Sequence, residues 1–380
     1  MNTSIKSNDW TFPYCPSQDN LSINWTALEN KFDWLKSLAE CAQDPRYHAE
    51  GNVLIHTKMV CEALINLPQW QALPNREQSI LFAAALLHDV AKPISTEIAE
   101  DGGISSKGHV LQGAKMTQQI LWDLNVPLVE REAIIALVKY GGLPLWFWDK
   151  SNPEKAVIKA SQIIRCDLLS LLAEADVKGR YCDDQKQLLE RIDFFREFCQ
   201  ENECFEKPKI FPSGHSRFIY FQKEDRDPHY AAYDDTQFHV VMMSGLPGAG
   251  KDTWISKNLP DWEVISLDEI RKKMNVDPED DQGMVVNAAK ALAKEYMRKN
   301  QGFVWNATNL SSQIRGGLIR LFAGYQANIQ IVYLETSWEE LLRRNHTRIA
   351  KVPEKVIYRM RNRLEVPNIT EAHQVNWVVE

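Results

Sequence analysis

The spacing of hydrophobic residues divides the chain of 380 residues into two parts with different periods. From about residue 27 to 204, apolar residues recur every three or four positions, which predicts helices, and few stretches alternate as a half-buried strand does. After residue 237, short apolar runs such as 240–243 and 329–335 alternate with helical patterns, which predicts a doubly wound parallel sheet with helices on both faces. The predicted domains are an all-α domain over 1–204, with its core at 27–204, and an α/β domain over 237–380.

Residues 205–236, between the two parts, predict an ordered connector. Prolines, a glycine and mixed charges interrupt helical spacing here. Phe218, Tyr220 and Phe221 favour a strand that pairs with one of the domains. We therefore expect the domain boundary near residue 205.

Composition excludes a membrane protein and favours a globular one. Hydrophobic residues make up 44% of the chain and charged residues 25%, and no apolar run approaches the roughly 20 residues that span a bilayer. Residues 1–20 lack the apolar core of a signal peptide, so we expect a cytoplasmic protein. The seven cysteines form no CxxC pair and are expected to be reduced thiols in the core or at the surface.

The net charge of −7 argues against wrapping long stretches of nucleic-acid duplex, which needs many cationic contacts to phosphates. It does not exclude binding of nucleic-acid ends. Residues 341–363 contain eight lysines and arginines against one acid, Glu354, so the local field there is strongly positive.

A glycine-rich stretch, GLPGAGKDTW, follows the apolar run 240–243 and predicts a phosphate loop. Glycines let the backbone bend tightly and bring its N–H groups to phosphate oxygens, and the helix that follows presents its positive end to the same anion. A glycine-rich turn between a strand and a helix is the simpler alternative. The expected ligands of ATP or another NTP are Gly245, Pro247, Gly248, Ala249, Gly250, Lys251, Asp252 and Thr253.

Asp252 stands where a phosphate loop usually has the Ser or Thr that holds Mg²⁺. Thr253 comes one position later. Either this hydroxyl or the Asp252 carboxylate could contact the metal, so the sequence leaves both open.

The same domain carries candidate groups for a hydroxyl acceptor. Asp268 follows a predicted strand and could accept the proton of an attacking hydroxyl, while Arg271 could hold a phosphate of the acceptor. A helix N-cap aspartate followed by an arginine is the simpler alternative. Asn306 and Thr308 are expected to position substrate or a metal-bound water.

Two arginines of a basic helix complete this set. Arg344 and Arg348 are four residues apart and could clamp the transferring phosphoryl group. The alternative is a solvated basic helix.

The helical part carries candidate metal ligands. Either His48 or His56, with His56 preferred because it lies within a helix, could join His88 and Asp89 at the end of a helix predicted over Ile80–Ala91. Imidazole and carboxylate suit a transition metal such as Mn²⁺, Ni²⁺, Co²⁺ or iron.

Three cationic or titratable side chains flank those candidate ligands. Asp176 and Arg180, four residues apart on one helical face, would place a ligand beside a phosphate-binding guanidinium. Lys92 follows His88 by four residues, and His109 precedes another helix. Taken singly, each histidine is more simply a core or surface residue.

Four blocks of the helical part together resemble the HD superfamily of metal-dependent phosphohydrolases. HAEGNVLIHTKMV, LLHDVAKP, GHVLQGAKM and EADVKGR look like the HD domain that accompanies some bacterial tRNA nucleotidyltransferases. The resemblance implies phosphoester hydrolysis, with Lys92, His109 and Arg180 holding the phosphate or protonating the leaving group. Residues 140–142, Tyr-Gly-Gly, depart from such domains, which often have a further histidine there.

GLPGAGKDTW, SLDEIR, WNATN and the block RRNHTR with VPEKVIYRM resemble the polynucleotide 5′-kinase family. This implies that Lys251, Arg344 and Arg348 contact donor phosphates, that Asp268 is the base and that Arg271 holds the acceptor phosphate. Asp252 and Asn306 depart from the better-known kinases of this family.

The whole chain resembles bacterial end-healing enzymes that join an HD phosphoesterase to a polynucleotide kinase. The implied function is removal of 2′,3′-cyclic phosphate or 3′-phosphate ends and phosphorylation of 5′-hydroxyl ends of RNA or DNA, which would prepare both ends for a nucleic-acid ligase. The alternatives are a mononucleotide phosphohydrolase fused to a small-molecule kinase, and a non-enzymatic NTP-gated sensor. Asp268 and Arg271 speak against a sensor, which needs no base.

Overall fold

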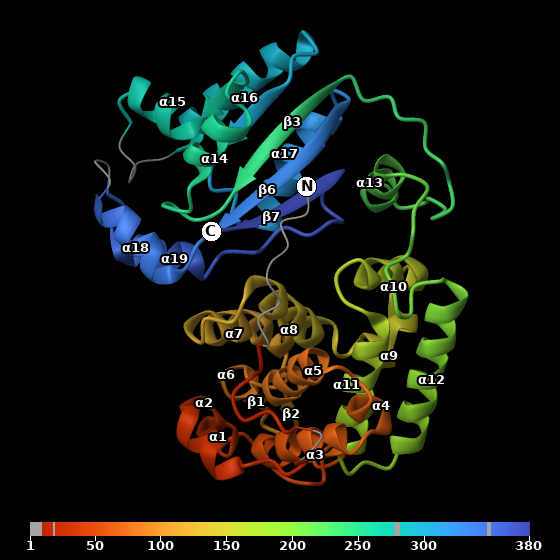
Figure 1. The fold of residues 1–380 in the computed structure, drawn as a ribbon. Coiled ribbons are helices and arrows are strands. Elements are labelled where there is room, and N and C mark those ends of the chain that lie inside the picture. The colour runs from red at the N-terminus through yellow and green to blue at the C-terminus, as the bar shows by residue number, and fades with distance from the viewer. Residues whose placement is uncertain (1–9, 18–19, 277–281, 348–350) are drawn as a thin grey trace. The chain divides into compact units, whose positions relative to one another are not determined.

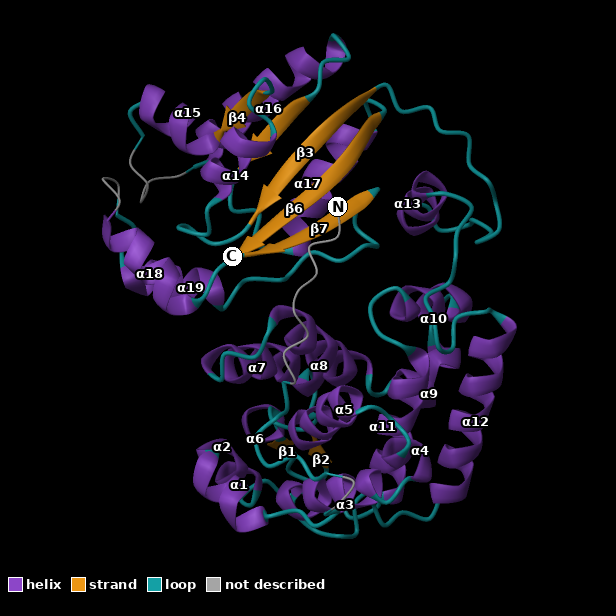
Figure 2. Cartoon of the chain, in the orientation of Figure 1, coloured by secondary structure: helices purple, strands orange, loops and turns teal. Residues whose placement is uncertain are grey.

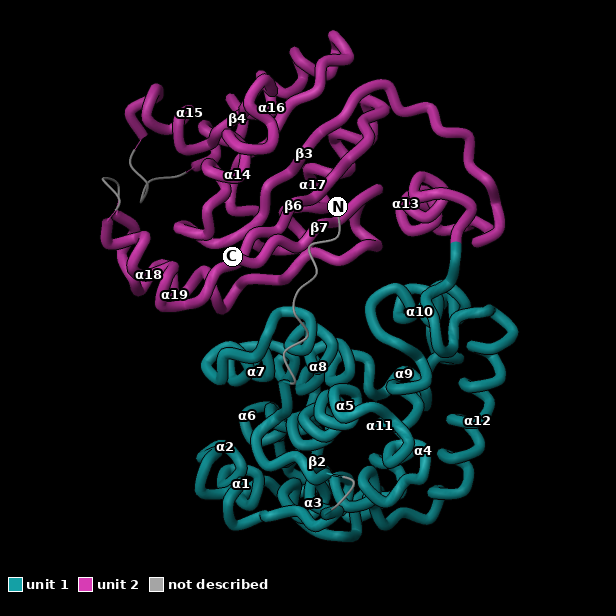
Figure 3. The backbone as a smooth tube through the Cα atoms, viewed as in Figure 1, with its two compact units in different colours: residues 1–210 teal, residues 211–380 magenta. Residues whose placement is uncertain are grey.

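The computed structural model describes residues 10–17, 20–276, 282–347 and 351–380, and the chain divides into two compact units. The first unit ends at Ile210 and the second begins at Phe211 (Figures 1 and 3). No helix among the described residues is both long and apolar enough to cross a bilayer.

The first unit is mainly helical, as predicted, with one short antiparallel hairpin (Figure 2). Its described elements are α1 (Trp25–Lys31), α2 (Asp33–Leu38), α3 (Val53–Ile65), α4 (Pro68–Gln71), α5 (Asn75–Leu87), α6 (Lys92–Ser95), β1 (Glu97–Ile98), β2 (Ile104–Ser105), α7 (His109–Asp123), α8 (Leu128–Tyr140), α9 (Leu143–Trp146), the 3₁₀ helix η1 (Phe147–Asp149), α10 (Pro153–Ser161), α11 (Cys166–Lys178) and α12 (Gln185–Glu201).

Helix α5 lies at the centre of this unit, because every residue from Gln78 to Leu87 is buried. A helix that is apolar on all sides must be surrounded by other helices. Helices α3, α8 and α11 pack against it, and all three have an apolar face. The candidate ligands come from the ends of these central helices.

The end of α5 differs from the prediction. The helix ends at Leu87, with His88 as its C-cap, rather than continuing to Ala91. Pro93 does not terminate α5 but lies in the first turn of α6, where a missing backbone N–H leaves no hydrogen bond unmade. The residues between the two helices form a turn that carries His88 and Asp89.

The second unit contains a five-stranded parallel sheet, as predicted (Figure 2). The strand order is β4-β5-β3-β6-β7, so the strand before the phosphate loop is central. The strands are β3 (Phe238–Ser244), β4 (Glu263–Ser266), β5 (Phe303–Asn306), β6 (Ala327–Glu335) and β7 (Gln374–Val379). The helices are α13 (Gly214–Gln222), α14 (Lys251–Asn258), α15 (Leu267–Lys273), α16 (Gly283–Arg298), α17 (Ser312–Ala323), α18 (Trp338–Thr347) and α19 (Glu354–Arg361).

Successive residues of β3 enter two separate cores, one on each face of the sheet. Val240 and Met242 pack in the core that includes residues of α16 and α17, whereas Val241 and Met243 pack with Ile255 of α14. This alternation is the two-residue period of a strand. It explains the continuous apolar run, since a parallel strand covered by helices has no solvent-facing side.

The segment with Phe218, Tyr220 and Phe221 is a helix, α13, so the predicted strand is wrong. Ser213 caps this helix by accepting a hydrogen bond from the Ser216 N–H. The Phe218 ring stacks on His373 at 4.0 Å between centroids and joins the core of the second unit. Residues 211–236 therefore begin the second unit and are more than a connector.

Candidate functional site

Four side chains from three segments of the first unit converge on one small space. His56 Nε2 lies 3.1 Å from Asp176 Oδ1, 3.3 Å from His88 Nε2 and 3.8 Å from Asp89 Oδ2. His88 Nε2 lies 3.2 Å from Asp89 Oδ2. Ligand atoms about 2.0–2.2 Å from one metal ion lie roughly 3 Å apart when adjacent, so these spacings match those of a coordination shell.

Backbone carbonyls fix the proton positions of the histidines. His56 Nδ1 lies 3.1 Å from Gly179 O, His88 Nδ1 lies 2.7 Å from Ala85 O, and His109 Nδ1 lies 2.6 Å from Ser106 O. A carbonyl oxygen only accepts hydrogen bonds, so each Nδ1 carries the proton and donates it. In the neutral rings the Nε2 lone pairs are then free to bind a metal or a substrate proton.

Gly179 allows this arrangement by bringing the end of α11 against α3. A Cβ at residue 179 would lie 2.6 Å from Val60 N, which is too close for any side chain. The close approach places the Gly179 carbonyl beside His56. It also ends α11 before Arg180, which was expected on the helix but lies just past it.

The cationic candidates surround the two aspartates. Lys92 Nζ lies 2.7 Å from Asp89 Oδ2, Arg180 forms an ion pair with Asp176, and His109 Nε2 lies 3.9 Å from Asp89 Oδ1. Burial raises the pKa of Asp89, but His88 and Lys92 outweigh it and hold this pKa well below its usual range. Burial likewise raises the pKa of Asp176, and Arg180 with His56 lowers it overall. Both carboxyl groups are therefore ionised at neutral pH.

His48 lies beside this cluster and contacts Glu50, a residue that the sequence did not single out. Glu50 Oε1 lies 2.9 Å from the Nδ1 atoms of both His48 and His56, and the Glu50 side chain is 0% exposed. Burial lowers the pKa of His48 to about 4, so its ring is neutral near pH 7. The available signal was the two-residue spacing of His48 and Glu50 in HAEGN, because an acid beside a histidine is a frequent orienting partner.

The donor set fits a divalent transition metal. Asp89 Oδ2 and Asp176 Oδ1 are both buried, and each lies within 3.2 Å of an imidazole Nε2. Two imidazole nitrogens face the same space as these oxygens. His56, rather than His48, lies close to both aspartates, whereas His48 contacts Glu50.

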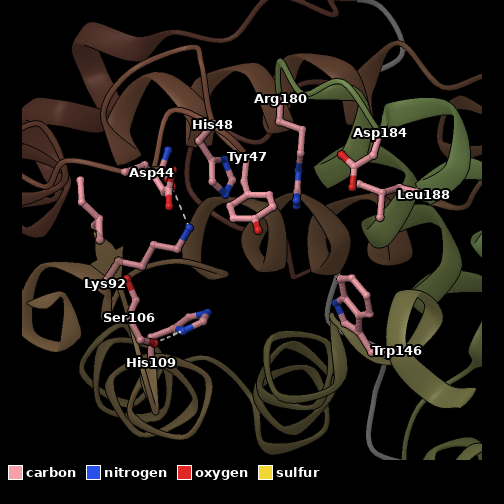
Figure 4. A pocket seen from close by; sticks show the side chains of 12 residues that line it. Asp44, Tyr47, His48, Lys92, Ser106, His109, Trp146, Arg180, Asp184 and Leu188 are labelled. Atoms are coloured by element: carbon pink, nitrogen blue, oxygen red, sulfur yellow. Dashed lines mark hydrogen bonds between the residues drawn. The ribbon is translucent and has the colours of Figure 1, made fainter. Parts of the chain in front are cut away.

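A pocket of about 410 Å³ opens next to the cluster. Its lining includes His48, Lys92, His109, Arg180 and the aromatic Trp146, whose side chains come from different elements (Figure 4). Asp44 and Asp184 also line the pocket, so Lys92, Arg180 and the two imidazoles are the groups in it that suit a phosphate-bearing ligand. The aromatic ring provides an apolar surface for the remainder of that ligand.

In the second unit, the phosphate loop follows β3 as predicted. Gly245, Gly248 and Gly250 have φ values of 142°, 88° and 94°, which favour glycine. The Lys251 ammonium donates to the carbonyls of Gly245 and Leu246 at 3.0 and 2.9 Å, so the lysine spans the loop. The Thr308 carbonyl accepts a hydrogen bond from the Gly245 N–H at 3.0 Å and anchors the start of the loop.

The two unusual residues of this unit contact each other. Asn306 Nδ2 donates to Asp252 Oδ1 at 2.6 Å, across 54 positions of the chain. Asn306 is buried at the end of β5, whereas Asp252 is exposed in the first turn of α14. The carboxylate thus belongs to the loop and the amide to the strand. Together they present two oxygen donors, which suits Mg²⁺.

Asp268 and Arg271 lie one turn apart on α15, just after β4. Arg271 Nη1 lies 2.5 Å from Asp268 Oδ1, and Arg271 Nε donates to Gln282 Oε1 at 2.6 Å. The Asp268 side chain is 65% exposed and is available to a ligand.

Arg344 of α18 lies over the phosphate loop. A Cβ on Gly250 would come within 3.2 Å of Arg344 Nη1. The guanidinium is paired with Glu340 at 2.6 Å and with Glu380 at 2.9 Å. Arg348, its predicted companion, lies outside the described residues.

The similarity to known proteins falls in the second unit. Residues 240–367 match a family described as an AAA domain. Over 135 residues the chain is 25% identical to the L-seryl-tRNA(Sec) kinase of Methanococcus maripaludis. The aligned region covers 34% of this chain and 53% of that protein. The chain therefore spans about half the length of this curated relative. The second unit is a kinase-like P-loop domain.

A solved structure of a candidate kinase from Chloroflexus aurantiacus is also similar to part of this chain. It shares 14% identity with a TM-score of 0.33 and covers 38% of this chain and 86% of its own.

Proposed function

We propose that this protein heals broken ends of RNA or DNA in the cytoplasm with two separate sites. The first unit would be an HD phosphohydrolase that converts 2′,3′-cyclic phosphate or 3′-phosphate ends to a 3′-hydroxyl. The second would phosphorylate a 5′-hydroxyl end with ATP or another NTP. The observation that carries the proposal is that one chain has two sites. A buried His–Asp cluster lies beside a pocket lined by Lys92 and Arg180, and a phosphate loop shares its domain with Asp268 and Arg271 of α15.

The residues of the first site divide into metal ligands and phosphate-binding groups. His56, His88, Asp89 and Asp176 would hold a divalent transition ion such as Mn²⁺, Ni²⁺ or Co²⁺, which when bound supplies Lewis acidity toward a phosphoryl oxygen. Arg180 and Lys92 line the pocket and would bind the remaining phosphate oxygens.

His109 would act on the leaving oxygen of the ester. Its Nδ1 proton is held by the Ser106 carbonyl, and its ring lines the pocket. A proton carried on Nε2 could then pass to the departing oxygen.

The second site would bind the donor and the acceptor from different elements. The backbone N–H groups of residues 245–253 and the Lys251 ammonium would bind the NTP phosphates, with Asp252 and Asn306 contributing to the Mg²⁺ site. Arg344, which already lies against Gly250, would neutralise charge on the transferring phosphoryl group.

Asp268 and Arg271 would serve the acceptor. When Arg271 turns to an acceptor phosphate, the Asp268 carboxylate loses its present partner and can accept the proton of the attacking hydroxyl.

Two features favour a nucleic-acid acceptor over a free metabolite. The curated relative is by name a kinase of an RNA-linked group, L-seryl-tRNA(Sec). In addition, Arg343, Lys351, Lys355 and Arg359 are exposed on and between α18 and α19, where they could contact a phosphate backbone.

The test uses the full chain and an oligonucleotide with a 5′-hydroxyl and a 2′,3′-cyclic phosphate. With NTP, Mg²⁺ and Mn²⁺, both ends should change, and a nucleic-acid ligase should then join the product. Free nucleosides and mononucleotides are the matched comparison substrates.

Three outcomes contradict the proposal in different ways. Activity on mononucleotides and free nucleosides but not on oligomers would favour a mononucleotide phosphohydrolase fused to a small-molecule kinase. Tight NTP binding without turnover of any acceptor would favour a sensor. An oligomer recovered with both ends unaltered would exclude end healing.

A further inference from the structure

Three of the seven cysteines, which the sequence presented as scattered, meet inside the first unit. Cys166 begins α11, Cys199 lies in the last turn of α12, and Cys204 follows that helix. All three are 0% exposed and none is in a disulfide. Their Sγ atoms lie within 4.8 Å of one another.

The chain reverses at an unfavourable residue to bring Cys204 into this group. Glu203 has a φ of 54°, a left-handed conformation in which glycine is usual after a helix. The Cys204 N–H donates to Cys199 O at 2.8 Å, and the Glu203 N–H donates to Gln200 O at 2.9 Å. A non-glycine residue is disfavoured in this conformation, so the turn has a geometry that the local sequence alone would not choose.

We propose that Cys166, Cys199 and Cys204 form a structural zinc site. A zinc ion with Zn–S bonds of about 2.3 Å in a tetrahedral shell holds its sulfur atoms about 3.8 Å apart. Three Sγ atoms that all lie within 4.8 Å of one another are compatible with this spacing. An iron–sulfur cluster, which has several iron atoms and sulfides between its cysteines, needs a wider opening than these thiols leave.

A buried ammonium group lies in the segment that follows Cys204. Lys209 has a side chain that is only 2% exposed, and its ammonium pairs at 3.0 Å with Glu203, whose own side chain is 75% exposed and can be hydrated instead. Zinc with three thiolates carries one negative charge, which the ammonium would offset.

An oxygen donor is available for the fourth position. The Ser161 hydroxyl donates to Ile158 O at 2.7 Å, and its oxygen accepts from the Lys209 N–H at 3.2 Å, which leaves that oxygen one lone pair for a metal. Ser161 or a water molecule bound there would complete the tetrahedron.

The site would fasten the segment that leaves the first unit. The Asp167 N–H donates to Phe205 O at 3.1 Å, and Gln162 Nε2 donates to Lys209 O at 2.8 Å, so residues 204–209 already pack against the start of α11. Cys166 and Asp176 are ten residues apart on one helix, about 15 Å at the rise of an α-helix. The zinc would therefore stabilise the helix that carries Asp176 without contacting the substrate.

Cobalt absorption tests the proposal, because only thiolate ligands give Co²⁺ an intense near-ultraviolet charge-transfer band. The full chain, stripped of metal and reduced, should develop this band with one equivalent of thiolate-bound Co²⁺, and Zn²⁺ should remove it. Nitrogen and oxygen ligands of the His56 cluster give no such band, so the two sites are distinguished without an activity assay.

Variants assign the band to these residues. Cys199→Ser and Cys204→Ser should abolish it, and Cys204→His, which keeps a metal ligand, should bind Co²⁺ with a weaker band. Cys61→Ser is the matched control, since Cys61 is equally buried in α3 but lies outside the cluster.

A wild-type protein that binds Co²⁺ without the thiolate band would overturn the proposal, even if the serine variants fail to fold. A Cys199–Cys204 disulfide in freshly purified protein would also overturn it.

Discussion

The His–Asp cluster of the first unit and the phosphate loop of the second differ in how much of their geometry exists without a ligand. In the cluster, the imidazoles are oriented by backbone carbonyls and the two aspartates are nearly buried. Around the loop, the charged groups satisfy one another: Lys251 bonds to loop carbonyls, and Arg344 pairs with Glu340. The first site is preorganised, whereas the second must exchange internal partners for its ligand.

This difference has an energetic meaning. Buried charges are costly to separate, so the cluster should tolerate few changes. Exposed ion pairs contribute little to stability, so those near the loop can break when phosphate arrives. Substitutions in the two sites should therefore have separable effects on activity, metal affinity and folding.

The largest effect is expected for Asp89→Asn. The substitution removes a metal ligand and leaves the Lys92 ammonium without its carboxylate, so release of 3′-phosphate should fall below detection while 5′-phosphorylation continues. Both reactions are measured on one labelled oligonucleotide. Loss of both in a folded protein would show that the sites are not independent.

Lys251→Ala should reverse this pattern. The loss of one positive group at the donor phosphates is expected to lower the kinase kcat by about 10²–10³-fold, with hydrolysis unchanged. Lys257→Ala, at an exposed position of the same helix, is the control. A normal kinase rate in Lys251→Ala would remove the phosphate loop from the mechanism.

Glu50→Gln tests the preorganisation of the first site. The amide keeps the size of the side chain but weakens the contacts to His48 and His56, so metal affinity should fall by about 10–100-fold. The measurement is calorimetric titration with Mn²⁺, with the exposed Glu100→Gln as the control. An unchanged affinity would mean that Glu50 has no part in orienting the ligands.

The smallest effect is expected for Glu340→Gln in the second unit. Its pairs with Arg343 and Arg344 are solvent-exposed, so the denaturation midpoint should not change measurably. Arg344 loses Glu340 and keeps only Glu380 as a partner, which should lower the KM for NTP a few-fold. A marked loss of stability would instead show that this ion-pair network is structural.

Local patterns predicted the sheet well, because the strands β3 to β6 carry short apolar runs and each precedes a helix. The phosphate loop was equally accessible, since its residues are contiguous. The helix α13 was predicted wrongly because its aromatic residues pack into a core formed by distant strands. The early end of α5 depends on the turn at His88 and Asp89, which spacing alone does not show.

Contacts between distant positions were the least predictable. The Asn306–Asp252 hydrogen bond joins two residues that each depart from the familiar motif. Neither departure could be used to predict the contact with the other. Glu50 and the three clustered cysteines were missed for the same reason, since their partners come from separate helices. The candidate ligands His56, His88, Asp89 and Asp176 were predicted with the help of resemblance in several sequence blocks, and the fold brings these four side chains together.

The absence of a side chain at Gly179 affects both parts of the proposed hydrolase site, the metal ligands and the phosphate-binding arginine. Because no carbon atom fits between this residue and Val60, even alanine would push the two helices apart. The ring on one helix would then lose its carbonyl acceptor, while the aspartate and arginine on the other side of the gap would shift with their own backbone. A mutant with every ligand intact could thus bind metal poorly.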